Sequence, residues 1–103
     1  ERILEVIRSN PVVVLRGETG SGKSTQVPQF ILDSCWQSSA HIIVSQPRRI
    51  AAVSLASRVA SERGESVGEA SVGYHIGGEE SLPLDANHSI VYCTEGALLR
   101  RLH

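Results

Sequence analysis

A glycine-rich stretch, GETGSGKST at positions 17–25, limits what this chain can fold into more than any other feature. It fits the pattern G-x-x-x-x-G-K-[ST], in which glycines let the backbone bend and point successive N–H groups at a phosphate. The pattern needs a buried strand before it and a helix after it, and the apolar run 12–15 and the segment 23–35 supply both. An ordinary Gly/Ser turn is the alternative interpretation, and this context favours the phosphate loop.

The other apolar patterns predict an α/β fold with a mostly parallel sheet flanked by helices, because strands and helices alternate and crossovers favour parallel pairing. The predicted strands are 12–16, 41–45, 71–76 and 90–93, and the predicted helices are 1–10, 23–35, 48–63 and 96–102. The helix over 48–63 has the clearest signal, since apolar residues recur at i, i+3, i+4, i+7 and i+8 and Gly64 follows as a terminator. Pro28 is tolerable near the first turn of its helix.

The phosphate loop carries a specific chemistry. Lys23 would reach the β- and γ-phosphates of a nucleoside triphosphate, and the Ser24 hydroxyl would hold Mg²⁺. A helix that starts at Lys23 adds its N-terminal partial positive charge to the same site. Kinases, GTPases, transporter ATPases and helicases all use this motif, so it predicts nucleotide and magnesium binding without a biological role.

Two adjacent arginines, Arg48 and Arg49, stand where a predicted strand ends and a helix begins. Cations at a helix start oppose the helix dipole, so this pair is a candidate for binding a phosphate backbone. A solvated pair of loop arginines is the alternative. The formal net charge of the chain is −1, so any contact with nucleic acid must come from a local basic group of this kind.

Four blocks then make a family recognisable: GETGSGKSTQVPQFILD, SQPRRIAAVSLASRVASERG, VGYHI with glutamates after it, and YCTEGALLRRL. In this order they resemble the first RecA-like domain of DEAH/RHA-type helicases of superfamily 2, and they cover most of residues 11–102. The resemblance implies a P-loop NTPase and an ATP-dependent RNA helicase, with ATP or another NTP and Mg²⁺ as cofactors. It also implies single-stranded RNA, or DNA, as a partner, and a second RecA-like domain that closes over the nucleotide.

By position, the resemblance implies roles for single residues. Those that would bind the phosphates are Gly20, Ser21, Gly22, Lys23, Ser24 and Thr25, with Lys23 and Ser24 as catalytic residues and Ser24 as the magnesium ligand. Arg48 and Arg49 would contact the nucleic-acid backbone, and the Thr94 hydroxyl would bind a phosphate oxygen. Arg58 would stack on the nucleotide base, which implies weak discrimination among NTPs. The residues themselves leave open that Thr94 is a helix N-cap and Arg58 a surface arginine.

The sequence departs from the family pattern at two positions and lacks one motif. Ser45 replaces the usual Thr before QPRR and keeps a hydroxyl, whereas Gly77 replaces an arginine usual after GY-x-I and removes an expected basic contact. No Asp-Glu-x-His sequence is present, and the acidic pair Glu79-Glu80 falls in a Gly-rich turn, so the carboxylates that position Mg²⁺ and water are missing. We therefore expect residues 1–103 to be a partial ATP-binding domain, truncated before this Walker B motif and inactive alone.

Two rival functions remain open. A divergent, catalytically inactive helicase-like domain would serve as an RNA-binding or scaffolding module. Gly77 favours this rival, and the intact Lys23 and Ser24 count against it. An unrelated P-loop kinase or transporter ATPase would require QPRR and TEG to be coincidences.

The remaining features of the sequence concern the cellular compartment. No apolar run reaches the roughly 20 residues needed to span a bilayer, and no signal-peptide pattern opens the chain. We expect an intracellular protein, either nuclear or cytoplasmic, in which Cys35 and Cys93 stay reduced and mostly buried. The histidines lack the spacing of metal ligands.

Overall fold

The computed structural model describes residues 5–7, 12–16, 23–35, 39–85 and 87–102 of the chain. Its elements are β1 (Glu5–Ile7), β2 (Val12–Arg16), α1 (Lys23–Ser34), β3 (Ala40–Gln46), α2 (Arg49–Glu62), β4 (Val72–Ile76), β5 (Glu79–Ser81), β6 (His88–Thr94) and α3 (Glu95–Leu102). None of the helices in these described ranges is long and apolar enough to cross a membrane.

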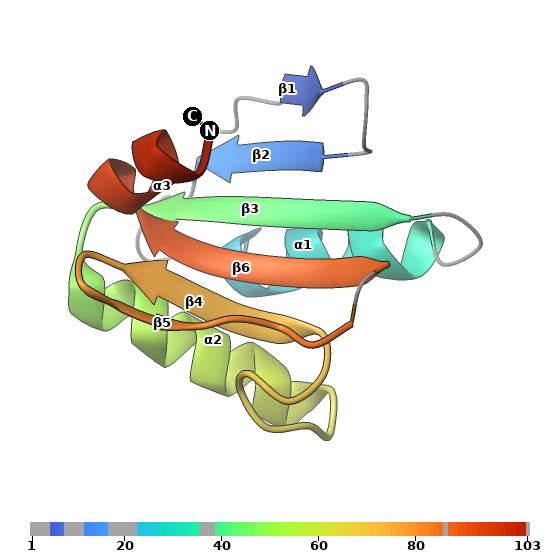
Figure 1. Cartoon of the computed structure of the whole chain (residues 1–103). Coiled ribbons are helices and arrows are strands. Elements are labelled where there is room, and N and C mark those ends of the chain that lie inside the picture. The colour runs from blue at the N-terminus through green and yellow to red at the C-terminus, as the bar shows by residue number, and fades with distance from the viewer. Residues whose placement is uncertain (1–4, 8–11, 17–22, 36–38, 86, 103) are drawn as a thin grey trace.

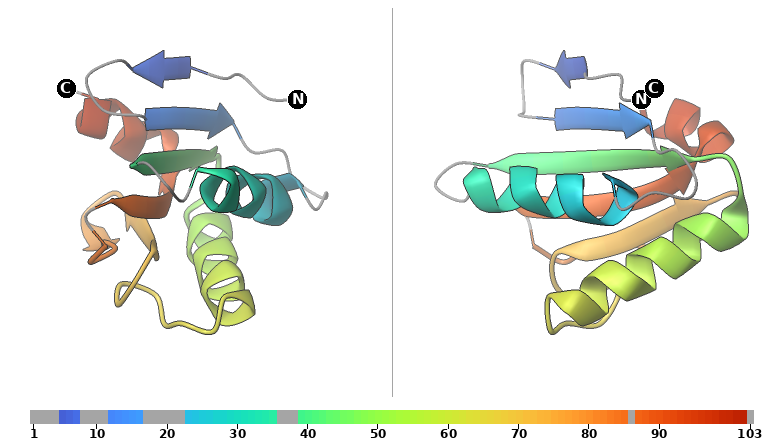
Figure 2. Two further views of the ribbon diagram at one scale, coloured as in Figure 1. Left: turned by 90° about the vertical axis from the view of Figure 1, so that its right-hand side faces the viewer. Right: turned by 180° about the vertical axis from the view of Figure 1, so that it is seen from behind.

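The six strands among the described residues form one sheet in the order β1-β2-β3-β6-β4-β5 (Figure 1). The pairs β2–β3, β3–β6 and β4–β6 are parallel, whereas the two edge pairs, β1–β2 and β4–β5, are antiparallel. α1 and α2 cover one face of this sheet, and α3 lies on the other face (Figure 2). The prediction of an α/β fold with a mostly parallel sheet between helices is therefore confirmed.

Two apolar clusters hold the helices against the sheet. The larger one, under α1 and α2, is built on Leu15, Leu32, Ala40, Ile42, Val44, Ala52, Ala56, Val59, Ala60, Val72, Ile76, Ile90 and Tyr92. The smaller one, under α3, is Ile43, Cys93 and Ala97. Because the central strands are buried on both faces, their sequences read as continuous apolar runs rather than alternating ones.

The predicted stripe and stop of the 48–63 helix are confirmed. Its buried residues are Ala52, Ala56, Val59 and Ala60. The Gly64 N–H donates to the Ser61 carbonyl over 3.1 Å, and the Glu65 N–H donates to the Ala60 carbonyl over 2.9 Å. Gly64 has a φ of 73°, so this pair of bonds is a Schellman-type end that needs a left-handed residue.

The predicted helix over 1–10 is wrong for Glu5–Ile7, which forms β1 and pairs antiparallel with β2. Few apolar positions supported that helix, and a ladder along the edge of β2 satisfies backbone groups of both strands. The other residues of that prediction lie outside the described ones. A second difference concerns the acidic pair, since Glu79 and Glu80 belong to β5 and only Gly77 and Gly78 make the turn before it.

Candidate nucleotide and nucleic-acid site

The carboxyl ends of β2, β3 and β6 meet at one edge of the sheet (Figure 1). Arg16 pairs with Ser45, and Gln46 pairs with Thr94, so the last residues of these strands lie side by side. The chain leaves β3 through Pro47 and Arg48 into α2, and leaves β6 directly into α3. In open parallel sheets ligands bind outside this edge, so we call it the carboxyl edge and take it as the candidate site.

The phosphate-loop residues are described only in part. Gly20, Ser21 and Gly22 lie outside the described residues, and Lys23 is described only as the start of α1. Ser24 and Thr25 follow in the first turn and are buried, with 4% and 3% of their surfaces exposed. The structure therefore fixes the helix that follows the loop and not the cradle itself.

A glutamine at the end of β3 contacts the first turn of α1. The Gln46 side chain donates from Nε2 to the Ser24 Oγ over 3.5 Å, and both residues are buried. The sequence assigned no role to Gln46, although its position offered a signal, since a glutamine that ends a buried apolar strand needs a hydrogen-bond partner. Gln46 links the strand that leads to Arg48 with the helix that carries Ser24.

A buried tyrosine compensates for the proline inside α1. Pro28 has no N–H to donate to the Ser24 carbonyl four residues earlier, and it lies in the second turn rather than the first. The Tyr92 hydroxyl of β6 donates to that carbonyl oxygen over 2.6 Å. Burial raises the pKa of the Tyr92 hydroxyl, and the Glu62 charge adds to the shift, so the proton that makes this bond is retained. β6 thus supplies the donor that the proline removed.

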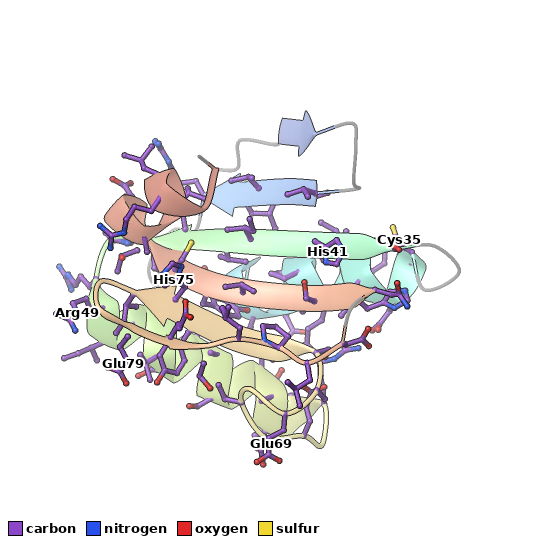
Figure 3. All side chains as sticks on the ribbon, viewed as in Figure 1. Cys35, His41, Arg49, Glu69, His75 and Glu79 are labelled. Carbon is purple, nitrogen blue, oxygen red and sulfur yellow. The ribbon has the colours of Figure 1, made fainter. Side chains whose placement is uncertain are left out.

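Arg48 and Arg49 are exposed at the start of α2, and Figure 3 shows Arg49 at the outer margin of the molecule. Arg48 is extended, with φ −124° and ψ 142°, and makes no side-chain cap hydrogen bond. The first turn of α2 has no acidic residue. Neither arginine forms an ion pair with another residue that the structure describes. Two cations and the positive end of a helix dipole therefore coincide without compensation.

Thr94 is the last residue of β6 and lies half-buried directly before α3. α3 has an acidic residue, Glu95, in its first turn, which suits the helix dipole. Within the described part of the chain, no hydrogen bond joins the Thr94 hydroxyl to the start of α3. The structure therefore gives no support to the alternative that Thr94 is an N-cap.

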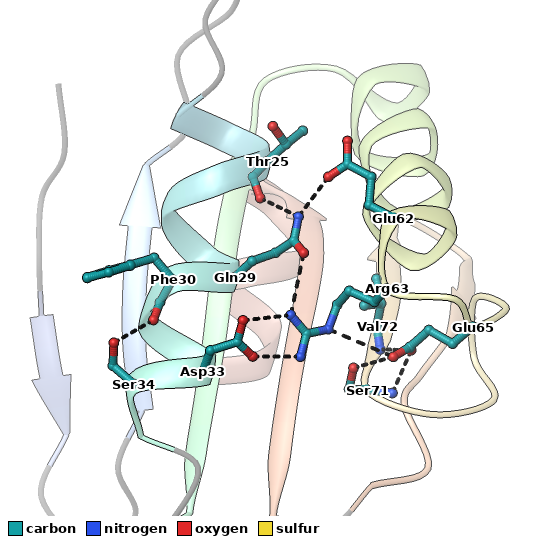
Figure 4. Close-up of polar contacts among 10 residues, drawn as sticks. All are labelled: Thr25, Gln29, Phe30, Asp33, Ser34, Glu62, Arg63, Glu65, Ser71 and Val72. Atoms are coloured by element: carbon teal, nitrogen blue, oxygen red, sulfur yellow. Dashed lines mark hydrogen bonds and ion pairs between the residues drawn. The ribbon is translucent and has the colours of Figure 1, made fainter.

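Arg58 lies away from Arg48 and Arg49, on the surface where α2 faces α1. Its Nε is 3.3 Å from Oε2 of Glu62, one helical turn later. Glu62 also accepts hydrogen bonds from α1, over 2.9 Å from Gln29 (Figure 4) and over 3.4 Å from Gln26. The hydrogen bond from Gln29 and then that from Arg58 lower the pKa of the Glu62 carboxyl. Arg58 is thus an exposed arginine with a local partner, beside the helix that carries Ser24.

Further along the same surface, ion pairs and hydrogen bonds fix the end of α2. Arg63 Nη2 is 2.9 Å from Asp33 Oδ1 of α1. Glu65 accepts hydrogen bonds from the N–H and the hydroxyl of Ser71, each over 2.7 Å, and from the Val72 N–H over 3.0 Å (Figure 4). These contacts clamp the loop that leads from α2 into β4, which is a structural role.

The remaining reactive side chains form no obvious centre. In the parts of the chain that the structure describes, no group of three or more His, Cys, Asp or Glu residues could hold a metal ion. Both cysteines are free thiols, Cys93 buried and Cys35 half-buried. Backbone N–H groups of Asn87 and His88 donate hydrogen bonds to the Asp85 carboxylate and lower the pKa of that carboxyl. These bonds form an Asx turn, so Asp85 has a local structural role.

No protein-family model matches the chain. The chain is 51% identical over 106 residues to the DExH-box ATP-dependent RNA helicase DExH1 of Arabidopsis thaliana, and 46% identical over 110 residues to DExH2 of the same plant. Both matches cover 99% of this chain but only 10% and 6% of the relatives. The crystal structure of the DEAH/RHA helicase HrpB from Escherichia coli matches 91% of this chain and 12% of its own, with a TM-score of 0.65 and 33% identity. The chain therefore spans a small part of each protein that it matches.

Proposed function

We propose that this chain forms the nucleotide-binding part of an ATP-dependent RNA helicase. The proposal is supported by its similarity to one segment of the DExH-box ATP-dependent RNA helicases. Residues 1–103 would be the beginning of the first RecA-like domain. The carboxylates for hydrolysis and a second RecA-like domain would be supplied by other parts of the protein.

In the proposed enzyme, ATP binds with its phosphates at the start of α1. The backbone of residues 20–22 and the Lys23 ammonium would hold the phosphates, with Thr25 beside them, and Arg58 would stack on the base. Ser24 fits the role of magnesium ligand, because its hydroxyl is a hard oxygen donor, buried and approached by the Gln46 amide. Bound Mg²⁺ would neutralise charge on the phosphates during transfer.

The observation that carries the nucleic-acid half of the proposal is the uncompensated pair Arg48–Arg49 at the N-terminus of α2. A phosphate group there would accept charge-assisted hydrogen bonds from the guanidinium groups and from the free helix N–H groups. The Thr94 hydroxyl would bind a phosphate oxygen of the same single strand, since Thr94 pairs with Gln46, two residues before Arg48. Such contacts hold the backbone and do not read the sequence of the RNA.

β3 would connect the two halves of the site. Gln46 contacts Ser24, and Arg48 stands two residues later in the chain. A movement at the magnesium ligand would therefore have a short path to the nucleic-acid contact. Closure of the second RecA-like domain over the nucleotide, followed by reopening, would use this path to step the protein along the strand.

ATP hydrolysis by the full-length protein, measured with and without single-stranded RNA, tests the proposal. Lys23→Ala should abolish RNA-stimulated hydrolysis and leave RNA affinity without nucleotide unchanged. Glu69→Ala is the matched control, because it removes an exposed charge far from the carboxyl edge and should change neither quantity (Figure 3). Hydrolysis that survives Lys23→Ala would show that the role given to Lys23 is wrong.

One alternative keeps the same fold but gives the protein a non-enzymatic function. In it, the protein is a catalytically inactive RNA-binding or scaffolding module, and Gly77 favours it, because the resemblance to DEAH/RHA-type helicases implies an arginine at that position. The same assay separates the two, because the inactive module would bind RNA through Arg48 and Arg49 and hydrolyse no ATP with or without RNA.

A further inference from the structure

The turn between β4 and β5 lies against α3. Gly77 opens this turn, and a Cβ placed on it would stand 3.8 Å from Nη2 of Arg100, the one such approach within 4 Å among the residues that the structure describes. Arg100 belongs to α3 and is exposed. The guanidinium of Arg100 therefore lies within van der Waals range of the point where a side chain at position 77 would begin.

The acidic groups near this turn are engaged elsewhere. Glu79 accepts a hydrogen bond from the Tyr74 hydroxyl over 2.9 Å, and Glu80 lies 3.6 Å from His75 Nε2. Arg100 forms no ion pair with any residue that the structure describes. Its positive charge is thus presented to solvent without a neutralising carboxylate, as are those of Arg48 and Arg49.

All three arginines belong to segments that follow the carboxyl ends of parallel strands. Arg48 and Arg49 follow β3, and Arg100 lies in the helix that follows β6. β3 and β6 are neighbours in parallel register, so both segments emerge at the carboxyl edge (Figure 1). The turn at Gly77 closes the same edge, because β4 runs parallel to β6.

We propose that Arg100 binds the phosphate backbone of the single strand at this edge and takes the place of the arginine that the family resemblance implies at position 77, where this chain has a glycine. The inference rests on the proposed function and adds to it a residue that binds the nucleic acid. Gly77 permits the replacement, since a glycine leaves the surface of the turn open to a guanidinium from α3. A planar guanidinium suits a phosphate because it donates two parallel hydrogen bonds. The departure at Gly77 is then a relocation of charge rather than a loss.

The test is the binding of a fluorescently labelled oligouridylate to the full-length protein, measured by anisotropy over a range of salt concentrations. Arg100→Gln should weaken binding about tenfold and reduce the steepness of the log–log salt dependence by about 0.7, the value for one lost phosphate contact on a single strand. Arg100→Lys should retain part of the affinity, since it keeps the charge and loses the planar fork.

The decisive variant is Gly77→Arg combined with Arg100→Gln, which returns a guanidinium to the turn. It should recover most of the lost affinity and the steeper salt dependence. Gly77→Arg alone should bring no comparable gain, because two guanidinium groups would compete for one place. A double variant that binds no better than Arg100→Gln would refute the proposal that Arg100 takes the place of a basic side chain at position 77.

The controls separate this inference from the proposed function. Arg48→Glu combined with Arg49→Glu must abolish tight binding if the strand lies at the carboxyl edge at all. Binding that is lost in that variant and unchanged in Arg100→Gln would refute the role of Arg100 alone. Binding unchanged in both would refute the nucleic-acid site itself. Equal urea midpoints for Arg100→Gln and the wild-type protein would exclude unfolding as the cause of weaker binding.

Discussion

Two charged regions of this molecule differ in how their charges are compensated. On the surface shared by α1 and α2, Arg58 pairs with Glu62 and Arg63 pairs with Asp33. At the carboxyl edge, Arg48 and Arg49 are exposed and have no ion-pair partner among the described residues. Paired charges connect elements of the same chain, whereas uncompensated cations at a helix start cost stability and indicate a site for an anion.

Charge reversal at the carboxyl edge should have the largest effect. Arg48→Glu with Arg49→Glu should weaken single-stranded RNA binding by about 100-fold or more, since hydrogen bonds to charged groups contribute about 1.5–3 kcal/mol each. The same change should raise the free energy of unfolding by about 0.5–1 kcal/mol, because acidic residues suit a helix N-terminus. RNA titration and urea denaturation measure the two quantities.

This double variant is expected to lose RNA affinity and to gain stability, and a structural role of the arginines would not produce that combination. A loss of stability in the same double variant would mean that the arginines hold structure, as the charges between α1 and α2 do. The charges at the carboxyl edge and those between α1 and α2 would then have the same structural role.

Next in size is the clamp at the end of α2. Glu65→Ala should lower the free energy of unfolding by about 2 kcal/mol, because the N–H groups of Ser71 and Val72 and the Ser71 hydroxyl would lose their acceptor. RNA affinity at a temperature where the variant is folded should not change. Denaturant unfolding followed by circular dichroism checks the first expectation, and a fall in RNA affinity of the folded variant would contradict the second.

Arg63→Ala should have a smaller effect on stability, about 1 kcal/mol, since its bond to Asp33 is partly exposed to solvent. Raising the salt concentration should shrink the difference from wild type, because salt screens exposed ion pairs. Arg63→Lys is the control that keeps the charge and changes the geometry. A difference that does not depend on salt would point to lost packing of the arginine stem instead.

The smallest effect is expected at Glu62. Hydrogen bonds from Gln29 and Arg58 hold the pKa of its carboxyl below the ordinary value of 4.5 in the folded state. Its contribution to stability is therefore present above the unfolded-state pKa and is lost as the pH falls through the lower folded-state pKa. Glu62→Gln should lower stability slightly near pH 7, because this contribution is lost, and should make unfolding less dependent on acid. An equal acid dependence in both proteins would contradict the assigned shift.

Sequence patterns predicted the elements whose signals are local. The buried strands β2, β3 and β6 and the stripe and stop of α2 agree with their apolar periodicity and with Gly64. β1 was not predicted, because pairing along the edge of β2, rather than periodicity, makes Glu5–Ile7 a strand. β5 was missed for the same reason, since it depends on the ladder with β4.

The same division holds for the candidate site. The phosphate-loop motif and the position of Arg48 and Arg49 at a helix start are visible in the sequence, because they depend on residues adjacent in the chain. The partners of Ser24 are not, since Gln46 lies 22 residues away and Tyr92 lies 68 residues away. Both reach α1 only once the sheet has formed.

The sequence by itself determined the fold class, the resemblance to helicases and the residues expected to meet phosphates, because motif spacing and apolar periodicity are local. Only the tertiary structure decided which charges are compensated. A carboxylate neutralises an arginine over a few ångströms of space, whatever their separation in the chain. That is why Arg63, which is paired, and Arg100, which has no such partner among the described residues, look alike in the sequence and differ in the folded protein.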